Sequence, residues 1–503
     1  MKSSLSIPFF KIMMSLRVNP FWIELGYFTT LSLLGFLALN YVSKPRTLPS
    51  FRPQNLDVLF TSVSSTTVSS MSTIEMEVFS NVQLVFMTIL MFLGGEAFTS
   101  FLSLKLIKNK ENKDKSFSNK DYELGNVINV DNKLEDVIII NPIEDHSHDH
   151  HDEIIKIKSI KLLSNVVFGY ILVVILLGSS LVSLYIILIP SAKQILNQKG
   201  LNLHTFSLFT TVSTFANCGF LPTNENMMIF KKNSGLLLIL IPQVLLGNTL
   251  FAPCLRIVIM FLWKITKRHE YEYILKNSKC VGYSHIFPSY ETIGIAITVV
   301  GLIVFQFVMF CSLEWNSEGT SGLSTYEKIV GSLFEVVNTR HTGQSVFDLS
   351  TFTPSILVLF ALMMYLSSYT TFLPVDNYEE KSEKMKKRKG RSLMEYISLS
   401  QPCCLVIFTI LICVVEKDKM KNDPLNFNVL NILFEVISAY GTVGLSIGYS
   451  CARQINPDGH CKDVTYGFAG KWSNTGKFIL IIVMFFGRLK KYNQRGGKAW
   501  KVL

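Results

Sequence analysis

The sequence contains little charge for its length. Of its 503 residues only 17% are Asp, Glu, Lys or Arg, whereas soluble proteins carry about 25%, and 49% are apolar. It has no glycine-rich phosphate loop, no zinc-type cysteine cluster, and no nucleophile–base pair or cluster of His, Asp and Glu within its apolar runs. We therefore expect neither a soluble fold nor an enzyme, and no cofactor. We interpret the net charge of +11 as basic cytoplasmic loops facing anionic lipid, so no nucleic-acid partner is expected.

Apolar runs long enough to cross a bilayer occur along the whole chain. A spanning helix needs about 20 apolar residues, and eight such runs lie near 21–42, 79–104, 162–190, 235–263, 291–312, 354–376, 396–415 and 474–488. Lys and Arg gather in 105–161, 264–279 and 381–391, which predicts that these segments and both termini are cytoplasmic. The short, charge-interrupted apolar patch before the first run is not typical of a cleavable signal. The sequence predicts an all-α, multi-pass membrane protein.

Between the two spans of each successive pair lies a shorter apolar segment. Each of these segments opens with Leu-Phe followed by Thr or Glu and ends in small residues; they cover 57–70, 205–219, 329–343 and 429–444. A half-helix that enters the membrane and returns as extended chain fits this length. The four copies predict four span–half-helix–span repeats, with eight transmembrane helices and four re-entrant half-helices around a central pore with pseudo-fourfold symmetry.

One residue in each copy stands where the half-helix is expected to end. Ten positions after the shared Phe this residue is Ser70, Gly219 or Gly444, and in the third copy, which is one residue shorter, it is Gly343. The four half-helices would aim their partly negative C-terminal ends at one point, and the chain after each would offer carbonyl groups that replace water around a cation. Because turn glycines alone do not recur at one repeat position, we expect a cation filter here.

The repeats divide the chain into four units joined by cytoplasmic segments. Repeat A covers 21–104, repeat B 161–263, repeat C 291–376 and repeat D 396–503, which includes a cytoplasmic C-terminus. The segments outside them are 1–20, 105–160, 264–290 and 377–395. The second of these contains the His-rich stretch 145–153, for which we expect a solvated loop, and whether that loop binds metal stays open.

The second span of each repeat carries a further shared motif. The segments 91–96, 244–249, 364–369 and 484–489 align without gaps and place Gly95, Asn248, Ser368 and Arg488 at one position, directly after Gly94, Gly247, Ser367 and Gly487. We expect these residues to lie well below the filter and to line the inner cavity, with a break at Ser367 and Ser368 as a candidate gate. Arg488 is expected to form a barrier to cations there; the alternative is a side chain that snorkels to the headgroups.

Two of the nine cysteines share a polar loop after the fourth half-helix. Cys451 and Cys461 lie ten residues apart in a segment that the charge distribution places outside the cell, where disulfides persist. Two interpretations stay open, namely a disulfide and two free surface thiols.

The filter segments resemble those of one transporter family. The stretches TVSSMST, FANCGFLPTNENM, NTRHTGQS and SAYGTVGLSIGYS, together with TYEKIVGSLFEVVNTRHTG, ITKRHEYEYILKN and YGFAGKWS, resemble the plant high-affinity potassium transporters (HKT) of the Trk/Ktr/HKT superfamily. The resemblance covers nearly the whole chain except 105–160 and 377–395. Ser70 occupies the first filter position, and in this the chain resembles the sodium-selective subfamily, which has Ser there.

The resemblance implies a sodium transporter of the plasma membrane that works by channel-like passive uniport, with a role in sodium retrieval and salt tolerance in plants. It also allows a homodimer. The alternatives are a Na⁺/K⁺ symporter and a less selective conduit for both ions, since family members with a Gly filter are described in that way. A voltage-gated channel is not expected, because no span carries Arg or Lys at every third position.

Overall fold

The computed structural model describes residues 20–42, 45–46, 53–106, 146–366, 401–455 and 461–489. Within these residues the regular elements are helices, with one isolated antiparallel bridge between Tyr449 and Val464. Short turns of 3-10 helix connect them: η2 (Met76–Val78), η3 (Asn226–Phe230), η4 (Glu318–Thr320), η5 (Leu349–Thr351), η6 (Cys451–Arg453) and η7 (Phe468–Lys471). The described part of the chain is therefore all-α, as the sequence predicts.

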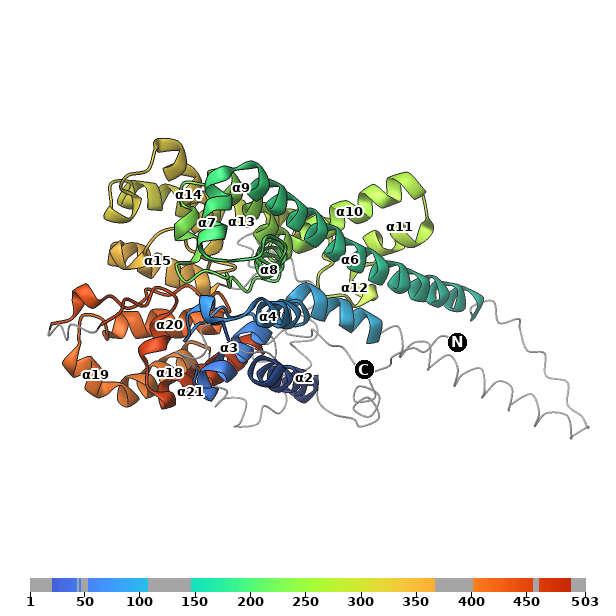
Figure 1. Ribbon diagram of the computed structural model, residues 1–503. Helices are drawn as coiled ribbons and strands as arrows, with labels where there is room; N and C mark the ends of the chain where they lie inside the picture. Colours follow the sequence, from blue (N-terminus) through green and yellow to red (C-terminus); the bar gives the residue numbers. More distant parts are fainter. Residues whose placement is uncertain are drawn as a thin grey trace, which may run out of the picture.

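The helices of repeats A and B follow the predicted order of span, half-helix and span (Figure 1). In repeat A they are α2 (Pro20–Leu37) with the π-helical turn η1 (Ala38–Val42), the half-helix α3 (Asn55–Thr67), and α4 (Asn81–Gly94) with the helix Glu96–Leu106. In repeat B they are α6 (His146–Leu188), α7 (Pro190–Gln198), the half-helix α8 (Leu203–Phe215), α9 (Ser234–Gly247) and α10 (Phe251–Thr266).

Repeats C and D repeat this order. Two short helices, α11 (His269–Lys276) and α12 (Ser278–Val281), lead from repeat B into repeat C. Repeat C consists of α13 (Ser289–Glu314), the half-helix α14 (Thr325–Asn338) and α15 (Pro354–Tyr365). Repeat D consists of α18 (Gln401–Val415), α19 (Lys417–Asn422), the half-helix α20 (Val429–Gly441) and α21 (Asn474–Arg488).

The lengths of the described helices separate single, bent and short spans. Three single helices are long and apolar enough to cross a membrane, namely Phe21–Val42, Ile154–Leu188 and Ser289–Glu314. Two bent pairs reach that length together: α4 with Glu96–Leu106, bent by 54°, and α9 with α10, bent by 84°. The described parts of the other three predicted spans, α15, α18 and α21, contain 12, 15 and 15 residues.

Side-chain caps explain where several of these helices begin. Asn202 caps α8 and Asn428 caps α20, since each side-chain oxygen accepts a hydrogen bond from a free N–H group of the first turn. Ser324 forms a capping box with Glu327 at the start of α14, and Ser473 caps α21. These caps pair N–H groups that the first turn of a helix leaves without a partner inside the helix.

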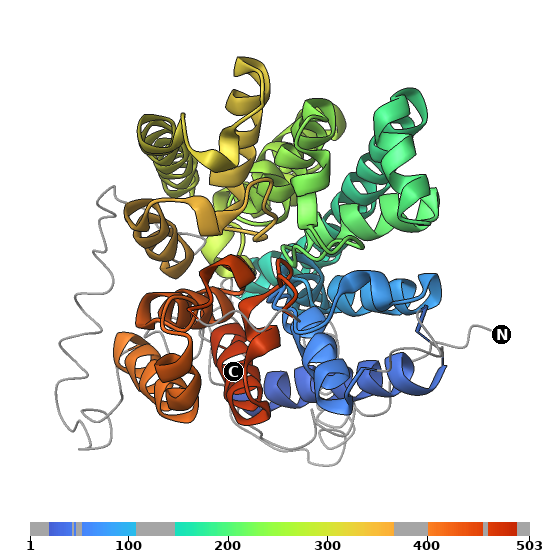
Figure 2. The ribbon, with the colours of Figure 1, turned by 60° about the vertical axis from the view of Figure 1, so that its left-hand side comes forward.

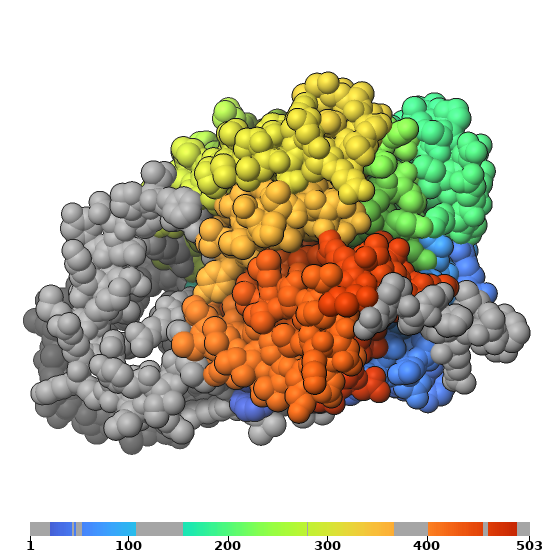
Figure 3. Space-filling view, turned by 90° about the vertical axis from the view of Figure 1, so that its left-hand side faces the viewer, coloured from blue at the N-terminus to red at the C-terminus, as the bar shows by residue number. Residues whose placement is uncertain are grey.

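The four repeats surround a common centre (Figure 2). Each half-helix packs against the second span of the preceding repeat: α8 against α4, α14 against α9, α20 against α15, and α3 of repeat A against α21 of repeat D. The last contact joins the two ends of the chain and closes the ring. Figure 3 shows repeats C and D lying against each other along one face of the molecule.

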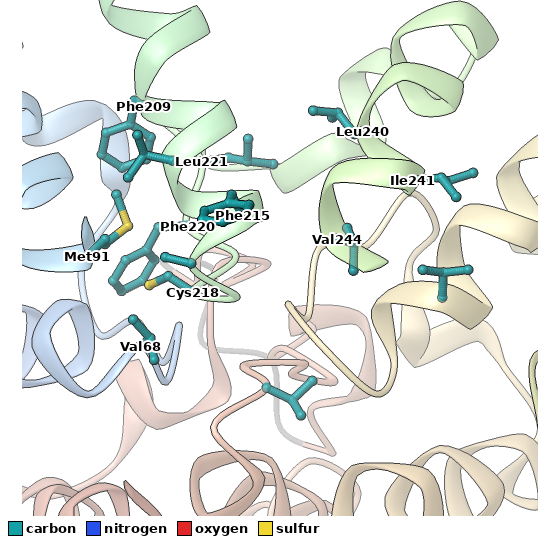
Figure 4. Packing of buried hydrophobic residues seen from close by; sticks show 14 of the residues in the cluster. Val68, Met91, Phe209, Phe215, Cys218, Phe220, Leu221, Leu240, Ile241 and Val244 are labelled. Carbon is teal, nitrogen blue, oxygen red and sulfur yellow. The ribbon is translucent and has the colours of Figure 1, made fainter. Parts of the chain in front are cut away.

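Apolar side chains fill the boundaries between repeats. Figure 4 shows Val68 and Met91 of repeat A beside Cys218 and Phe220 of repeat B, and all four are at most 3% exposed. Because the packed interior begins at the residues that flank the filter positions, the filter chain has rigid support on its outer side.

The start of α6 corrects one expectation from the sequence. The His-rich stretch 145–153 was expected to be a loop, but α6 begins at His146 and continues for 43 residues into the third span. At about 1.5 Å per residue this helix is roughly 65 Å long, which exceeds the hydrocarbon thickness of about 30 Å. The helix α11 packs against α6, so part of the predicted linker 264–290 is ordered beside it.

Candidate ion filter and inner pore

The chain reverses direction at each of the four predicted filter positions. Ser70, Gly219, Gly343 and Gly444 all have positive φ, at 53°, 90°, 63° and 93°. Glycine adopts this left-handed region freely, whereas an L-residue such as Ser70 pays a steric cost of about 1 kcal/mol. A positive φ thus occurs at this position in all four repeats, including the one that lacks glycine.

These four positions lie next to one another in a closed ring. A Cβ on Gly219 would collide with the carbonyl oxygen of Thr342 in repeat C, and a Cβ on Gly343 would collide with that of Val443 in repeat D. A Cβ on Gly444 would overlap Ser70 Cβ in repeat A. The ring therefore runs from A through B, C and D back to A, and backbone carbonyls face the positions where side chains are absent.

The Ser70 side chain lies inside this ring. Its Oγ atom is 2.8 Å from where a Cβ of Gly444 would be and 3.0 Å from where a Cβ of Gly219 would be. The residue is only 7% exposed. The hydroxymethyl group thus lies between repeats B and D, whereas neighbouring atoms leave no room for a Cβ at the other three positions.

A network of buried side chains surrounds the filter of repeat C. His341 Nε2 lies 2.8 Å from Thr249 Oγ1 of repeat B, and Gln344 Nε2 donates to Thr214 Oγ1 of the half-helix α8 at 3.0 Å. Thr249 stands in the break between α9 and α10. The filter of repeat C is thereby tied by hydrogen bonds to the half-helix and the bent span of repeat B.

A small cavity opens beside the filter between repeats C and D. It has a volume of about 110 Å³, and its walls include Gly343 and Gly444 together with the carboxylates of Asp348 and Asp463. The two aspartates add negative charge beside this cavity, which attracts cations more than anions. Neither aspartate was predicted from the sequence.

A cystine-closed loop forms one wall of this cavity. Cys451 and Cys461 are joined by a disulfide, with 5.8 Å between their Cα atoms. The main chains of Tyr449 and Val464 exchange two hydrogen bonds of 2.8 Å beside it, and Arg453 donates to the carbonyl oxygen of Ser350 in repeat C. Of the two interpretations that the sequence left open, the structure contains the disulfide.

The glycines that recur in the second spans have a packing role. A Cβ on Gly94, Gly247 or Gly487 would collide with a carbonyl oxygen four residues before the filter position of the same repeat, in Thr66, Phe215 and Tyr440 respectively. These glycines therefore pack directly beneath the half-helix ends, closer to the filter than the sequence interpretation placed them. Because the contact is with backbone, no side chain fits at these positions.

The second spans also break or end at this level. The helix α4 ends at Gly94 and bends at Gly95, and α9 ends at Gly247 and bends at Asn248. In repeat C, α15 ends at Tyr365, and Ser367 and Ser368 lie outside the described residues. Gly95 packs near Ala216 of repeat B, with 3.2 Å between its ideal Cβ position and Ala216 Cβ. The break predicted for one span thus occurs in at least two others.

Arg488 ends the last helix and reaches into repeat A. Its guanidinium donates to the carbonyl oxygen of Gly94 and lies 5.1 Å from the centre of the Phe28 ring. The Gly94 carbonyl belongs to the partly negative C-terminal end of α4, which attracts a cationic side chain. The side chain is therefore held between repeats D and A at the level of the helix breaks.

Comparisons with known proteins agree with this architecture. The model of the TrkH family, described as "Cation transport protein", matches residues 144–373 and 377–493, more than half of the chain. The chain is 50% identical to the "Sodium transporter HKT1" of Arabidopsis thaliana over 91% of this chain and 90% of that protein. It is 48% identical to the "Cation transporter HKT1;3" of Oryza sativa subsp. japonica, over 96% and 92%.

The chain belongs to the HKT transporters of the TrkH cation transport family. A more distant relative, the "Cation transporter HKT2;4" of Oryza sativa subsp. japonica, is 38% identical over 96% of this chain and 94% of its own. The crystal structure of the potassium transporter TrkH from Vibrio parahaemolyticus has the same fold, with a TM-score of 0.50 at 14% identity, covering 94% of this chain and 83% of that one. The protein is thus a multi-pass membrane transporter of cations and not an enzyme.

Sequence reasoning missed some residues that support the filter. The residue after Leu-Phe is Thr or Glu in all four repeats, but no role was predicted for the two glutamates, Glu335 and Glu435, which are fully buried. A charged residue inside an otherwise apolar half-helix is a usable signal, because burial of an unpaired charge is costly.

Proposed function

We propose that this protein carries Na⁺ across the plasma membrane by channel-like passive uniport, through a filter formed by Ser70, Gly219, Gly343 and Gly444. The observation that carries the proposal is the Ser70 side chain within the closed ring of filter positions. Its Cβ and hydroxyl narrow the ring on the side of repeats B and D, which disfavours K⁺ more than the smaller Na⁺. The sodium transporter among the relatives, at 50% identity, supports the same ion.

The inner residues are proposed to control passage below the filter. A fixed positive charge at Arg488 repels cations, so we assign it the barrier, with the helix breaks at Gly95 and Asn248 and the run at Ser367 and Ser368 as the candidate gate. The bond of Arg488 to the Gly94 carbonyl supports this placement, because it holds the charge at the level of those breaks.

The membrane orientation follows the distribution of basic residues. Both termini are placed in the cytoplasm, and the loops after the half-helices, including the disulfide loop, face outward. A homodimer would contain two separate pores, since one chain already closes a ring of four repeats. The role in sodium retrieval and salt tolerance rests on the resemblance to the plant transporters.

The test is the reversal potential of Ser70→Gly in voltage-clamped cells. The parent's reversal potential should follow external Na⁺ and ignore K⁺, whereas the variant's should also move with K⁺. A conducting Ser70→Gly variant with unchanged Na⁺ preference would contradict the assignment of selectivity to this side chain. A parental reversal potential that depends on both ions at once would instead favour the symporter or the less selective conduit.

A further inference from the structure

Two buried carboxylates occupy the same repeat position in half-helices α14 and α20. Glu335 and Glu435 each follow the shared Leu-Phe pair, and both have no solvent exposure. Neither takes part in an ion pair among the described residues. A carboxylate without solvent exposure needs hydrogen-bond donors to offset the cost of its burial. The groups that donate to each glutamate therefore show which segment it fixes in position.

Glu335 binds the segment directly after the filter of repeat C, which contains Ser345 and Val346 and is called the exit chain below. Its Oε2 atom accepts a hydrogen bond from the Val346 N–H group at 2.9 Å. The Ser345 hydroxyl lies 3.2 Å from the same oxygen and 2.5 Å from the carbonyl oxygen of Phe347, so its single proton is shared between the two acceptors. These donors follow the filter residue Gly343 by three and two positions. The other oxygen, Oε1, has no hydrogen-bond partner in the described part of the chain. One carboxylate oxygen thus spans the gap between the half-helix and the exit chain.

Glu435 makes the equivalent connection in repeat D. Its Oε1 atom accepts from the Ser446 hydroxyl at 3.1 Å, and Ser446 follows Gly444 by two positions, as Ser345 follows Gly343. The same oxygen accepts from the Ala469 N–H group at 3.2 Å, in the turn η7 that precedes the last span. The hydroxyl of Ser446 also accepts from Phe468 N–H at 2.8 Å.

Repeats A and B have a hydroxyl where C and D have a carboxylate. Thr61 donates to the carbonyl oxygen of Asp57 within its own helix, at 2.9 Å. Thr210 Oγ1 has no partner among the described residues. A short side chain at this position does not reach the exit chain, so the two halves of the ring are supported differently.

We propose that Glu335 and Glu435 are positioning residues that fix the exit chains of repeats C and D and thereby set the ion selectivity of the filter. The inference rests on the proposed filter at Ser70, Gly219, Gly343 and Gly444. Ser345 and Ser446 each lie two residues after a filter glycine, so their hydrogen bonds to Glu335 and Glu435 fix the exit chain next to the filter. If the glutamate oxygen is lost, the ring of filter positions can widen towards the geometry that suits a larger ion. The acting feature is the hydrogen-bond acceptor rather than the negative charge.

Glutamine and methionine at residue 335 separate the acceptor from the charge. Glu335→Gln removes the charge but keeps one oxygen for Val346 and Ser345, with its amide nitrogen in the place of the unpartnered Oε1. Glu335→Met has similar length and no acceptor at that point. Ser345→Ala removes one donor and leaves the carboxylate, and Thr210→Ala is the control at the same repeat position in B.

The measurement is the Na⁺/K⁺ permeability ratio from reversal potentials, with surface protein quantified separately. This ratio does not depend on the number of folded molecules. If Glu335 only stabilised the fold, its loss would therefore lower the current and leave the permeability ratio unchanged. We expect Glu335→Met to lower the ratio about tenfold, as the loss of hydrogen bonds to a charged group would. Ser345→Ala should shift it in the same direction by less, while Glu335→Gln and Thr210→Ala keep the parental ratio.

Each result decides the proposal. A parental ratio in both Glu335→Met and Ser345→Ala would overturn it, as would a Glu335→Gln variant that shifts the ratio as far as Glu335→Met. If Glu335→Met carries no current, the Ser345→Ala ratio decides. Ser70→Gly, measured alongside, separates the two hypotheses: if it alone changes the ratio, only the positioning role fails, and if it too leaves the ratio unchanged, the filter assignment fails.

Discussion

A buried ion pair joins the last span to the first half-helix. Lys477, near the start of α21, places its Nζ atom 2.7 Å from Oδ1 of Asp57 in α3, and the two side chains are only 8% and 12% exposed. These residues are separated by 420 positions in the sequence. The pair therefore fastens repeat D to repeat A, at the contact that closes the ring.

Removing one member of this pair should lower the stability of the folded protein, whereas replacing both members should not. Lys477→Met leaves the Asp57 carboxylate buried without its cation, and the loss of one partner from a buried pair costs about 3–5 kcal/mol. In the double variant Lys477→Met/Asp57→Leu no charge remains, so stability should return to near or above that of the parent. Lys276→Met is the control, because its exposed pair with Glu272 contributes at most about 1 kcal/mol.

The assay is thermal unfolding of the purified protein in detergent, with five proteins measured at equal concentration: the parent, Lys477→Met, Asp57→Leu, the double variant and the Lys276→Met control. We expect Lys477→Met to unfold at a clearly lower temperature than the parent and the control, and the double variant to recover. If the double variant were as unstable as the sum of its two single variants, the two charges would not interact, and the closure of the ring would have to rest on apolar packing alone.

Three further experiments test other parts of the protein. Arg488→Gln should raise or reshape the Na⁺ current and leave the Na⁺/K⁺ ratio nearly intact, whereas unaltered current at all voltages would remove Arg488 from the barrier. Mass spectrometry of the non-reduced protein should find Cys451 and Cys461 linked, a bond worth roughly 2–3 kcal/mol; alkylation of both without reductant would disprove it. Gly247→Ala should lower the stability by about 1–3 kcal/mol, because its methyl group overpacks against a backbone carbonyl. The control Gly301→Ala in α13, where nothing lies within 4 Å of the Cβ position, should not lower the stability in the same unfolding assay.

The order of the helices could be predicted because the same pattern of span, half-helix and span occurs four times in the sequence. The half-helix of repeat D was expected over 429–444, and α20 runs from Val429 to Gly441. Apolar runs give the spans with similar accuracy, as α13 shows against the expected 291–312. Hydrophobic periodicity and length suffice for this, since the membrane requires every backbone group to be paired within its own helix.

The features that could not be predicted depend on contacts between repeats. The sequence shows a small residue at 94 and at 247, but only the packed structure shows that a half-helix carbonyl excludes a side chain there. The His-rich stretch was expected to be a loop because of its polarity, yet it continues the third span as the start of α6. Local composition does not report that a polar segment extends a helix whose far end is anchored by tertiary packing.

The ring is closed at three depths by contacts between the first and last repeats, and this determines how the Ser70 position works. Lys477 binds Asp57 at the start of the half-helix, Gly444 packs on Ser70 in the ring, and Arg488 binds the Gly94 carbonyl beneath it. The backbone of Ser70 is held at a φ of 53°, which a serine does not adopt without support. Ser70 packs against Gly444 of repeat D and Gly219 of repeat B. The side chain proposed to narrow the ring and the charge proposed to limit the current therefore both depend on contacts with repeat D. Loosening either of these contacts is expected to change the space around Ser70, so the selectivity proposed for this position would depend on the closed ring as well as on the residue itself.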